Sequence, residues 1–231
     1  MDPISELFNR MDEWRHLPSY QLERRADLFF SLYLPEVLSR ELGLPLREQL
    51  IPEFPVAKGV LDSAEGPDNR TFKIDYLARS RDGETVVFVE LKTDNSSIRH
   101  EQERYLDEAR GKGLPKLLDA LRTVITKTRA RGKYGCLLGQ LERLELVTNV
   151  QPGGSFDVSA PNTRPIVVYV QPRSAQLGTG AKPIADKTVL FTKFAEIVGE
   201  HDDPLSQRFA QSLREWACVD AGKPPMTGVA T

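Results

Sequence analysis

Three residues whose side chains suit phosphate chemistry lie close together in the sequence. Asp75 lies in one strand-like run, and Glu90 and Lys92 lie in the next. The pair Asp82-Gly83 separates the two runs, and Asp-Gly between apolar runs is the strongest short signal for a β-hairpin. A two-residue turn at this pair would place Asp75 opposite Glu90 with Cβ atoms about 5 Å apart, and Lys92 would project from the same face.

The same turn fixes the register of the whole hairpin. It predicts that Leu77 lies opposite Phe88 and that Arg81 lies opposite Glu84. Like charges that oppose each other directly destabilise a hairpin, so we expect a positive group between the two carboxylates. A divalent cation with hard oxygen ligands fits that place, and so does a neighbouring ammonium group.

A solvated face is the alternative, in which Asp75 and Glu90 merely point to water. The run from Thr85 to Leu91 is apolar on both faces, which is typical of a central strand. A Glu and a Lys at the end of such a strand lose part of their hydration and need partners. We therefore favour a functional site over a solvated face.

The spaced Asp75, followed by Glu90-Leu91-Lys92 at the end of an apolar strand and then by a helix, resembles the PD-(D/E)xK nuclease superfamily. The proline of that motif is absent, because Ile74 precedes Asp75. The resemblance covers the chain from about Tyr20 to about Val170. It implies an α/β fold with a mixed central β-sheet flanked by helices, a restriction-endonuclease-like core with N-terminal and C-terminal helical additions.

The resemblance also implies a function: metal-dependent hydrolysis of phosphodiester bonds in nucleic acid, most readily DNA. Asp75 and Glu90, with the carbonyl of Leu91, would hold one or two Mg²⁺ or Mn²⁺ ions. Lys92 would orient the attacking water or help to deprotonate it, and would offset negative charge on the phosphate. The alternative is a catalytically silent nuclease-fold module that binds nucleic acid or a protein partner, for example as an accessory subunit of a repair, transposition or defence system. Under either reading a homodimer or a protein partner is compatible with the sequence.

In such folds a first helix supplies a further acid to the metal site. Glu23 is the first candidate and Asp27 the second, while Glu53, in the strand expected next, could face the same site. The alternative is that Glu23 and Asp27 are surface acids that pair with Arg24 or Arg25.

A subset of the superfamily that trims nucleic-acid ends holds its substrate with a Gln and a Tyr on the helix after the Lys strand. Gln102 and Tyr105 are similar in type and place, although their spacing is i, i+3 rather than i, i+4. Both spacings put two residues on one helix face. The alternative for Tyr105 is an aromatic residue at the edge of the core.

Length, cysteine content and net charge limit the possible domain organisation, location and mode of nucleic-acid binding. The 231 residues predict one domain over residues 1–219 and a disordered tail over 220–231. Two distant cysteines, no signal peptide and no membrane-length apolar run predict a soluble cytoplasmic protein. Because the net charge is −2, positive charge for a nucleic acid must be local. The best candidates are Arg122, Lys127, Arg129, Arg131 and Lys133, although favourable placement at a helix C-terminus could explain two or three of them.

The elements that must position these residues follow from apolar spacing and from proline and glycine breaks. A helix capped by Ser19 is expected to run to about Leu34 and to restart after Pro35. We further expect helices over 1–17, 99–110, 114–130, 194–198 and 204–217, and strands over 46–56, 144–150, 165–171 and 188–191.

Overall fold

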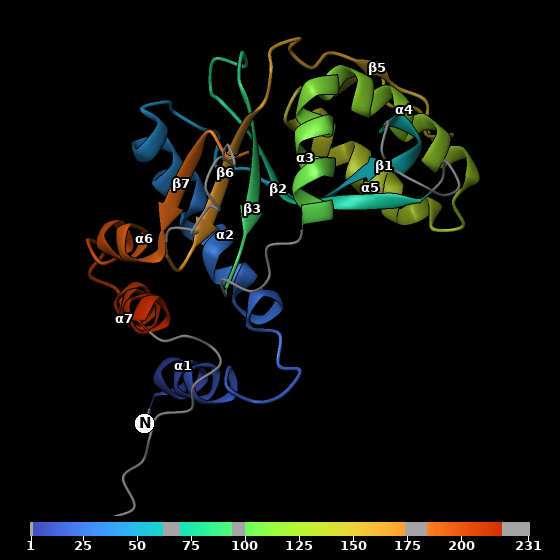
Figure 1. Ribbon diagram of the computed structural model, residues 1–231. Coiled ribbons are helices and arrows are strands. Elements are labelled where there is room, and N and C mark those ends of the chain that lie inside the picture. The colour runs from blue at the N-terminus through green and yellow to red at the C-terminus, as the bar shows by residue number, and fades with distance from the viewer. Residues whose placement is uncertain (1, 62–69, 94–99, 174–183, 219–231) are drawn as a thin grey trace, which may run out of the picture.

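A mixed five-stranded β-sheet with helices against both faces forms the centre of the computed structural model (Figure 1). The structure describes residues 2–61, 70–93, 100–173 and 184–218, with the backbone alone for 100–102. The tail predicted over 220–231 lies outside these ranges.

The helices are α1 (Pro3–Trp14), α2 (Leu22–Leu42), α3 (His100–Lys112), α4 (Leu114–Lys127), α5 (Arg131–Arg143), α6 (Phe191–Val198) and α7 (Pro204–Cys218), with a 3₁₀ turn η1 (Lys58–Val60). The strands are β1 (Ile51–Ala57), β2 (Thr71–Arg79), β3 (Val86–Leu91), β4 (Val147–Thr148), β5 (Asp157–Val158), β6 (Ile166–Gln171) and β7 (Lys187–Leu190). Within the described ranges, no helix is long and apolar enough to cross a membrane.

The strand order of the main sheet is β1-β2-β3-β6-β7. The first three strands form an antiparallel meander, β6 pairs parallel with β3, and β7 pairs parallel with β6. The predicted central strand is confirmed, because β3 occupies the middle position and all its residues are buried. Pro52 and Pro55 lie in the edge strand β1, where a missing backbone donor costs little.

Two local predictions around α2 are wrong. The helix continues through Pro35, where a break was expected, and it begins at Leu22, because Ser19 has a positive φ of 66° and caps nothing. Proline inside a helix costs about 3 kcal/mol. Val37 and Leu38, on the turn after the proline, are fully buried, so packing offsets that cost.

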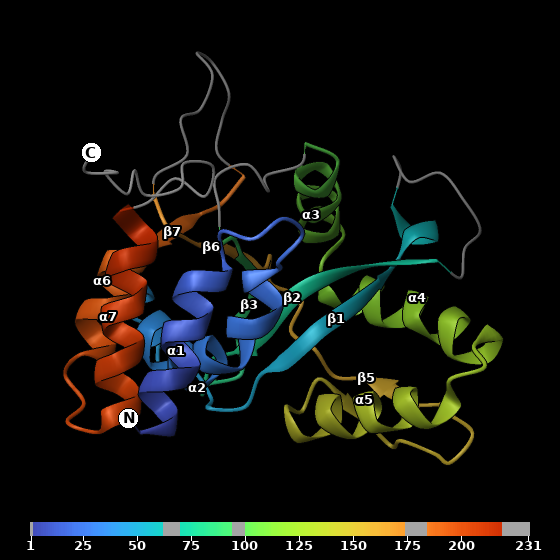
Figure 2. The ribbon, with the colours of Figure 1, turned by 90° about the horizontal axis from the view of Figure 1, so that it is seen from below.

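Two hydrophobic clusters lie on opposite faces of the sheet. One joins the sheet to α1, α2, α6 and α7, and the other joins it to α3, α4 and α5 (Figures 1 and 2). Side chains alternate along β3, so that Val87, Val89 and Leu91 enter the first cluster while Val86 and Phe88 enter the second. The central strand is therefore held from both sides.

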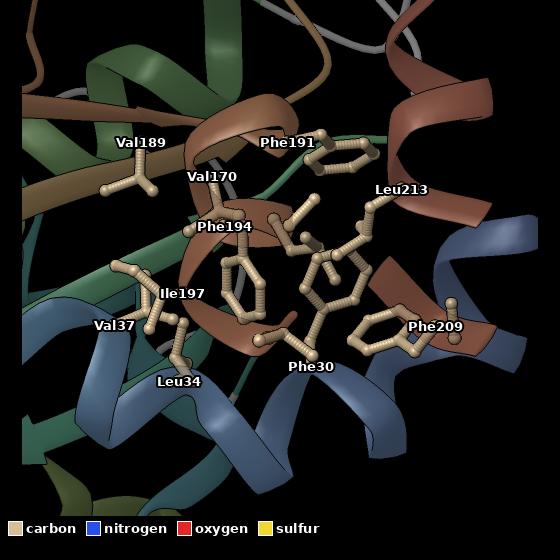
Figure 3. Packing of buried hydrophobic residues seen from close by; sticks show 14 of the residues in the cluster. Phe30, Leu34, Val37, Val170, Val189, Phe191, Phe194, Ile197, Phe209 and Leu213 are labelled. Atoms are coloured by element: carbon tan, nitrogen blue, oxygen red, sulfur yellow. The ribbon is translucent and has the colours of Figure 1, made fainter. Parts of the chain in front are cut away.

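Aromatic rings fill the first cluster (Figure 3). Phe30 of α2 lies 5.2 Å from Phe191, 5.1 Å from Phe194 and 5.2 Å from Phe209 between ring centroids. Edge-to-face contacts of this kind add to the burial of apolar area. They fix α2, the helix that carries Glu23, against the two C-terminal helices.

The predicted N-terminal docking helix is confirmed as α1, which packs along α7 (Figure 1). The Asp12 carboxylate accepts hydrogen bonds from Nε1 of Trp216 at 2.7 Å and from Nη2 of Arg208 at 2.6 Å. These bonds join residues about 200 positions apart. The first and last helices of the described chain thus pack together in the hydrophobic cluster that also contains α2.

Phe30→Ala should lower the free energy of unfolding by about 3–5 kcal/mol, because it leaves a cavity among three rings. Urea unfolding followed by circular dichroism measures this change. Leu28→Ala on the same helix is the matched control: Leu28 is 73% exposed, so its truncation should change stability by less than about 0.5 kcal/mol. Equal losses in the two variants would contradict this account of the core.

Candidate functional site

Strands β2 and β3 form the predicted hairpin with the predicted register. Leu77 lies opposite Phe88, and Tyr76 lies opposite Val89 in the last pair before the strands diverge. The site residues lie just beyond this last pair, at the open end of the hairpin.

The predicted two-residue turn is wrong: residues 81–84 form a four-residue loop. The Ser80 N–H donates to the Thr85 carbonyl at 2.9 Å and closes the loop, while the Arg81 N–H donates to the carbonyl of Pro45 at 2.8 Å. The Asp82 carboxylate accepts from the Glu84 N–H within the loop at 3.0 Å. The register survives because the longer loop takes one extra residue from each strand.

Asp75 takes over a hydrogen bond that the sheet would otherwise supply. Its carboxylate accepts the backbone N–H of Leu91 at 2.8 Å. In the regular ladder the partner of that N–H would be the carbonyl of Ile74, but the last β2–β3 pair is Tyr76 with Val89. The Asp75 side chain thus bridges the gap between the diverging strands.

The backbone of Leu91 points its polar groups to the same gap. The next N–H, that of Lys92, donates to the Val170 carbonyl of β6 at 2.8 Å. Because successive residues of a strand alternate their hydrogen-bonding edge, the N–H and C=O of Leu91 both point toward β2. The Leu91 carbonyl is therefore on the side where Asp75 lies.

Glu90 and Lys92 form a buried pair at the end of β3. Glu90 is 1% exposed and Lys92 is 5% exposed. The Lys92 ammonium donates to Oε1 of Glu90 at 3.1 Å. Burying a carboxylate requires such compensation, because an isolated charge in the interior costs several kcal/mol.

Carboxyl groups outnumber cations around this pair. Burial, together with the negative charges of Asp75 and Glu23, raises the pKa of Glu90 to about 8 against the lowering effect of Lys92. Burial also raises the pKa of Asp75, against the lowering effects of Lys92 and the Leu91 N–H. Burial would lower the pKa of Lys92, but its three carboxylate neighbours outweigh that effect and raise it. Three carboxylates thus share one buried ammonium.

The candidates for the further acid of the site lie around one small pocket of about 40 Å³, which has room for a single ion or a few waters. Glu23, Asp27, Glu53 and Asp75 all line it. Of the three candidates, only Glu23 raises the pKa values of both Glu90 and Lys92. Asp27 raises the pKa of Asp75, and Glu53 forms an ion pair with Lys73.

The donor set suits a hard divalent cation. Carboxylates of Asp75, Glu90 and Glu23 and the carbonyl of Leu91 are the oxygen ligands that Mg²⁺ and Mn²⁺ prefer. A double positive charge would allow these carboxyl groups to ionise together. In the arrangement described, however, no three His, Cys, Asp or Glu side chains of the described residues converge closely enough to hold a metal ion. Binding would therefore require the carboxylate side chains to draw together and Glu90 to part from the Lys92 ammonium.

Of the two predicted substrate contacts, the one that the structure describes, Tyr105, does not line the pocket. Tyr105 is 6% exposed and packs in the second hydrophobic cluster, with its ring 5.7 Å from that of Phe72. Lys58 lies over the Tyr105 ring at 4.9 Å and Arg104 at 5.7 Å. The side chain of Gln102 lies outside the described residues.

Two neighbours of the site were missed by the sequence reasoning. Lys73 lowers the pKa of Asp75, and its i, i+2 spacing from Asp75 in one strand could have revealed it. Tyr169 of β6 lies beside Glu90 in the parallel register, and burial raises its pKa. Only the pairing of β3 with β6 could reveal Tyr169, because no local spacing connects the two strands.

No protein-family model, curated protein or solved structure matches this chain.

In the absence of added metal, stability should fall as pH rises from about 4.5 to about 8. Over this range folded Glu90 retains a proton that the unfolded chain has lost, so unfolding releases a proton and becomes more favourable as pH rises. Thermal unfolding in EDTA at pH 5, 6, 7 and 8 measures this slope. Glu90→Gln, which cannot ionise, should flatten it, and an unchanged slope would show that Glu90 is not the titrating group.

Proposed function

We propose that this protein is a metal-dependent nuclease that hydrolyses phosphodiester bonds of nucleic acid, most readily DNA. The observation that carries the proposal is the buried Glu90–Lys92 pair at the end of the central strand, with the half-buried carboxyl groups of Asp75 and Glu23 close enough to shift the pKa values of both. A fold keeps several carboxyl groups around one buried ammonium at a cost in stability, and perturbed ionisable groups of this kind cluster at functional sites.

The order of elements supports the same proposal. A helix that carries an acid, α2, precedes the β1-β2-β3 meander, and α3 follows the strand that carries the lysine. This order agrees with the plan that the sequence resemblance implies for a restriction-endonuclease-like core. On that plan α1, α6 and α7 are the N-terminal and C-terminal additions, and they hold α2 in place.

Each residue of the site has a separate role in the proposed reaction. Asp75, Glu90 and the Leu91 carbonyl would hold one or two Mg²⁺ or Mn²⁺ ions, with Glu23 as the further acid. The ion supplies charge neutralisation at the scissile phosphate and lowers the pKa of a coordinated water. Lys92, freed from Glu90, would place its ammonium against the negative charge that develops on the phosphate. Tyr76 and Leu91, both members of the first hydrophobic cluster, form part of the wall of the pocket.

A second candidate function is a catalytically silent module with the same scaffold, binding nucleic acid or a protein partner. The Lys92–Glu90 contact at 3.1 Å favours it, because this ion pair already compensates part of the buried charge without a metal. A lysine that stays on Glu90 would neither act on a phosphate nor free the carboxylate.

The reducing cytoplasm remains the proposed location. Cys136 and Cys218 are both exposed free thiols in the structure. Exposed thiols persist where the compartment is reducing.

The unmodified protein should cut linear or nicked plasmid DNA with Mn²⁺ or Mg²⁺ and should be inactive in EDTA. Lys92→Met should lower the rate by about 10²–10³-fold, because it removes one electrostatic contact to the transition state. Gel electrophoresis of time courses measures the rate. Unchanged cleavage by Lys92→Met would exclude this site as the source of activity.

Metal binding is measured separately from cleavage by titrating Mn²⁺ against the melting temperature. A ligand that binds the folded state at 100 times its Kd stabilises it by about 2.7 kcal/mol. Asp75→Asn should lose this stabilisation, Lys92→Met should keep it, and the control Asp202→Asn, at an exposed acid outside the site, should behave as the unmodified protein does. Equal shifts in Asp75→Asn and the unmodified protein, together with no cleavage, would leave the binding module as the function.

A further inference from the structure

We propose that the junction of α4 and α5 is a second nucleic-acid contact surface, which holds backbone phosphates away from the reacting bond. The junction surface consists of Lys127, Arg129, Arg131 and Lys133. The inference rests on the proposed function for its choice of ligand, and it extends that function by stating how the substrate is held.

The four cations of the junction surface are all exposed, and none forms an ion pair with a residue that the structure describes. Between residues 120 and 141 the chain has five basic residues and no acidic one. The net charge of the whole chain is −2, so the rest of the chain carries −7. Positive charge is therefore concentrated at this junction.

Helix stability does not explain the arrangement. Lys127 ends α4, where the negative end of the helix dipole favours a cation. Arg131 and Lys133, however, lie in the first turn of α5, at the positive end of that helix, where cations are unfavourable and no acidic residue accompanies them. The sequence-based alternative of cations at one helix C-terminus thus applies to Lys127 alone, because α4 ends before the other three.

The fifth basic residue of the segment has a different role. Arg122 lies over the ring of Phe156, 4.2 Å from its centroid, and pairs with Asp119 at 3.3 Å. It helps to fix the β5 region on α4. Arg122 is therefore left out of the junction surface.

A groove of about 490 Å³ adjoins the junction surface, and Arg131 is the one member of that surface that lines it. Its walls come from the end of α4, the first half of α5 and the loop 150–154. Gly154 keeps that loop close to α4: its φ is +83°, and a Cβ there would lie 2.7 Å from Ile125. A phosphodiester backbone fits a groove of this kind, because its repeated charges can meet several cations along one line.

The junction surface is well separated from the candidate active site. In Figure 2 the α4–α5 junction lies at the right-hand edge of the molecule, whereas β3 lies near its centre. A ligand that reaches both must be a polymer rather than a nucleotide. Lys and Arg that contact phosphates carry no sequence information, so the surface should bind without regard to sequence.

The test measures binding of a fluorescent 30-base-pair duplex DNA by anisotropy in EDTA, over a series of salt concentrations. In the variant Lys127→Gln, Arg129→Gln, Arg131→Gln, Lys133→Gln the slope of log K against log salt should shrink by about 3 to 4, because each lost phosphate contact removes about 0.9. The rise in Kd between 50 and 200 mM salt should accordingly shrink roughly 100-fold. The double variant Arg131→Gln, Lys133→Gln should show about half of the change in slope.

The control has the same change in net charge at four exposed cations elsewhere: Arg10→Gln, Arg40→Gln, Lys193→Gln and Arg214→Gln. It should keep the slope of the unmodified protein. Junction variants that match this control, or an unmodified protein that does not bind the duplex at 50 mM salt, would overturn the inference. Failure of the proposed function looks different: salt-dependent binding would persist in EDTA while no metal gave cleavage.

Discussion

Burial of the Glu90 carboxylate at the end of the central strand is the constraint on which the rest of the site depends. A buried carboxylate costs several kcal/mol unless it is paired. Lys92, two residues later and directly after the end of that strand, supplies that pair at 3.1 Å. Burial above all, and then the negative charges of Asp75 and Glu23, raise the pKa of Glu90 to about 8. The site can therefore carry all its carboxylates ionised together only if further positive charge enters it.

The fold meets the cost of this site through the packing around it. β3 is buried along its whole length between two hydrophobic clusters, so its end cannot shift to let Glu90 reach water. On one side the rings around Phe30 fix α2 and with it Glu23. The same packing makes the buried charges expensive and keeps the backbone segments that carry them in place, so that only side chains need to move for an ion to bind.

Charge is also separated at the scale of the whole molecule. The acidic pocket lies at the end of the sheet, while the exposed cations of the junction surface lie at the α4–α5 junction. A chain with a net charge of −2 can attract a polyanion only where positive charge is concentrated. Under the proposed function the two regions would act in sequence, with the junction holding the backbone and the pocket receiving one phosphate.

Local pattern determined a large part of the structure. Strand period and turn residues were enough to predict the β2–β3 hairpin, its register and the central position of β3, because pairing across a short loop depends on neighbouring residues alone. The loop itself was predicted one residue too short on each side, because Arg81 bonds to Pro45, a partner that is distant in sequence. Pro35 inside α2 was mispredicted for a similar reason, since burial of the following turn overrides a local preference.

By itself the sequence determined which residues could carry the chemistry: Asp75, Glu90 and Lys92 follow from spacing along two neighbouring strands. The tertiary structure decided which acids lie near them, how far they are buried and how their pKa values shift. It also placed Tyr169 beside Glu90 and put Arg131 and Lys133 at a helix start rather than a helix end. These features arise from packing between distant segments and from the loss of water there, and neither is encoded in local spacing.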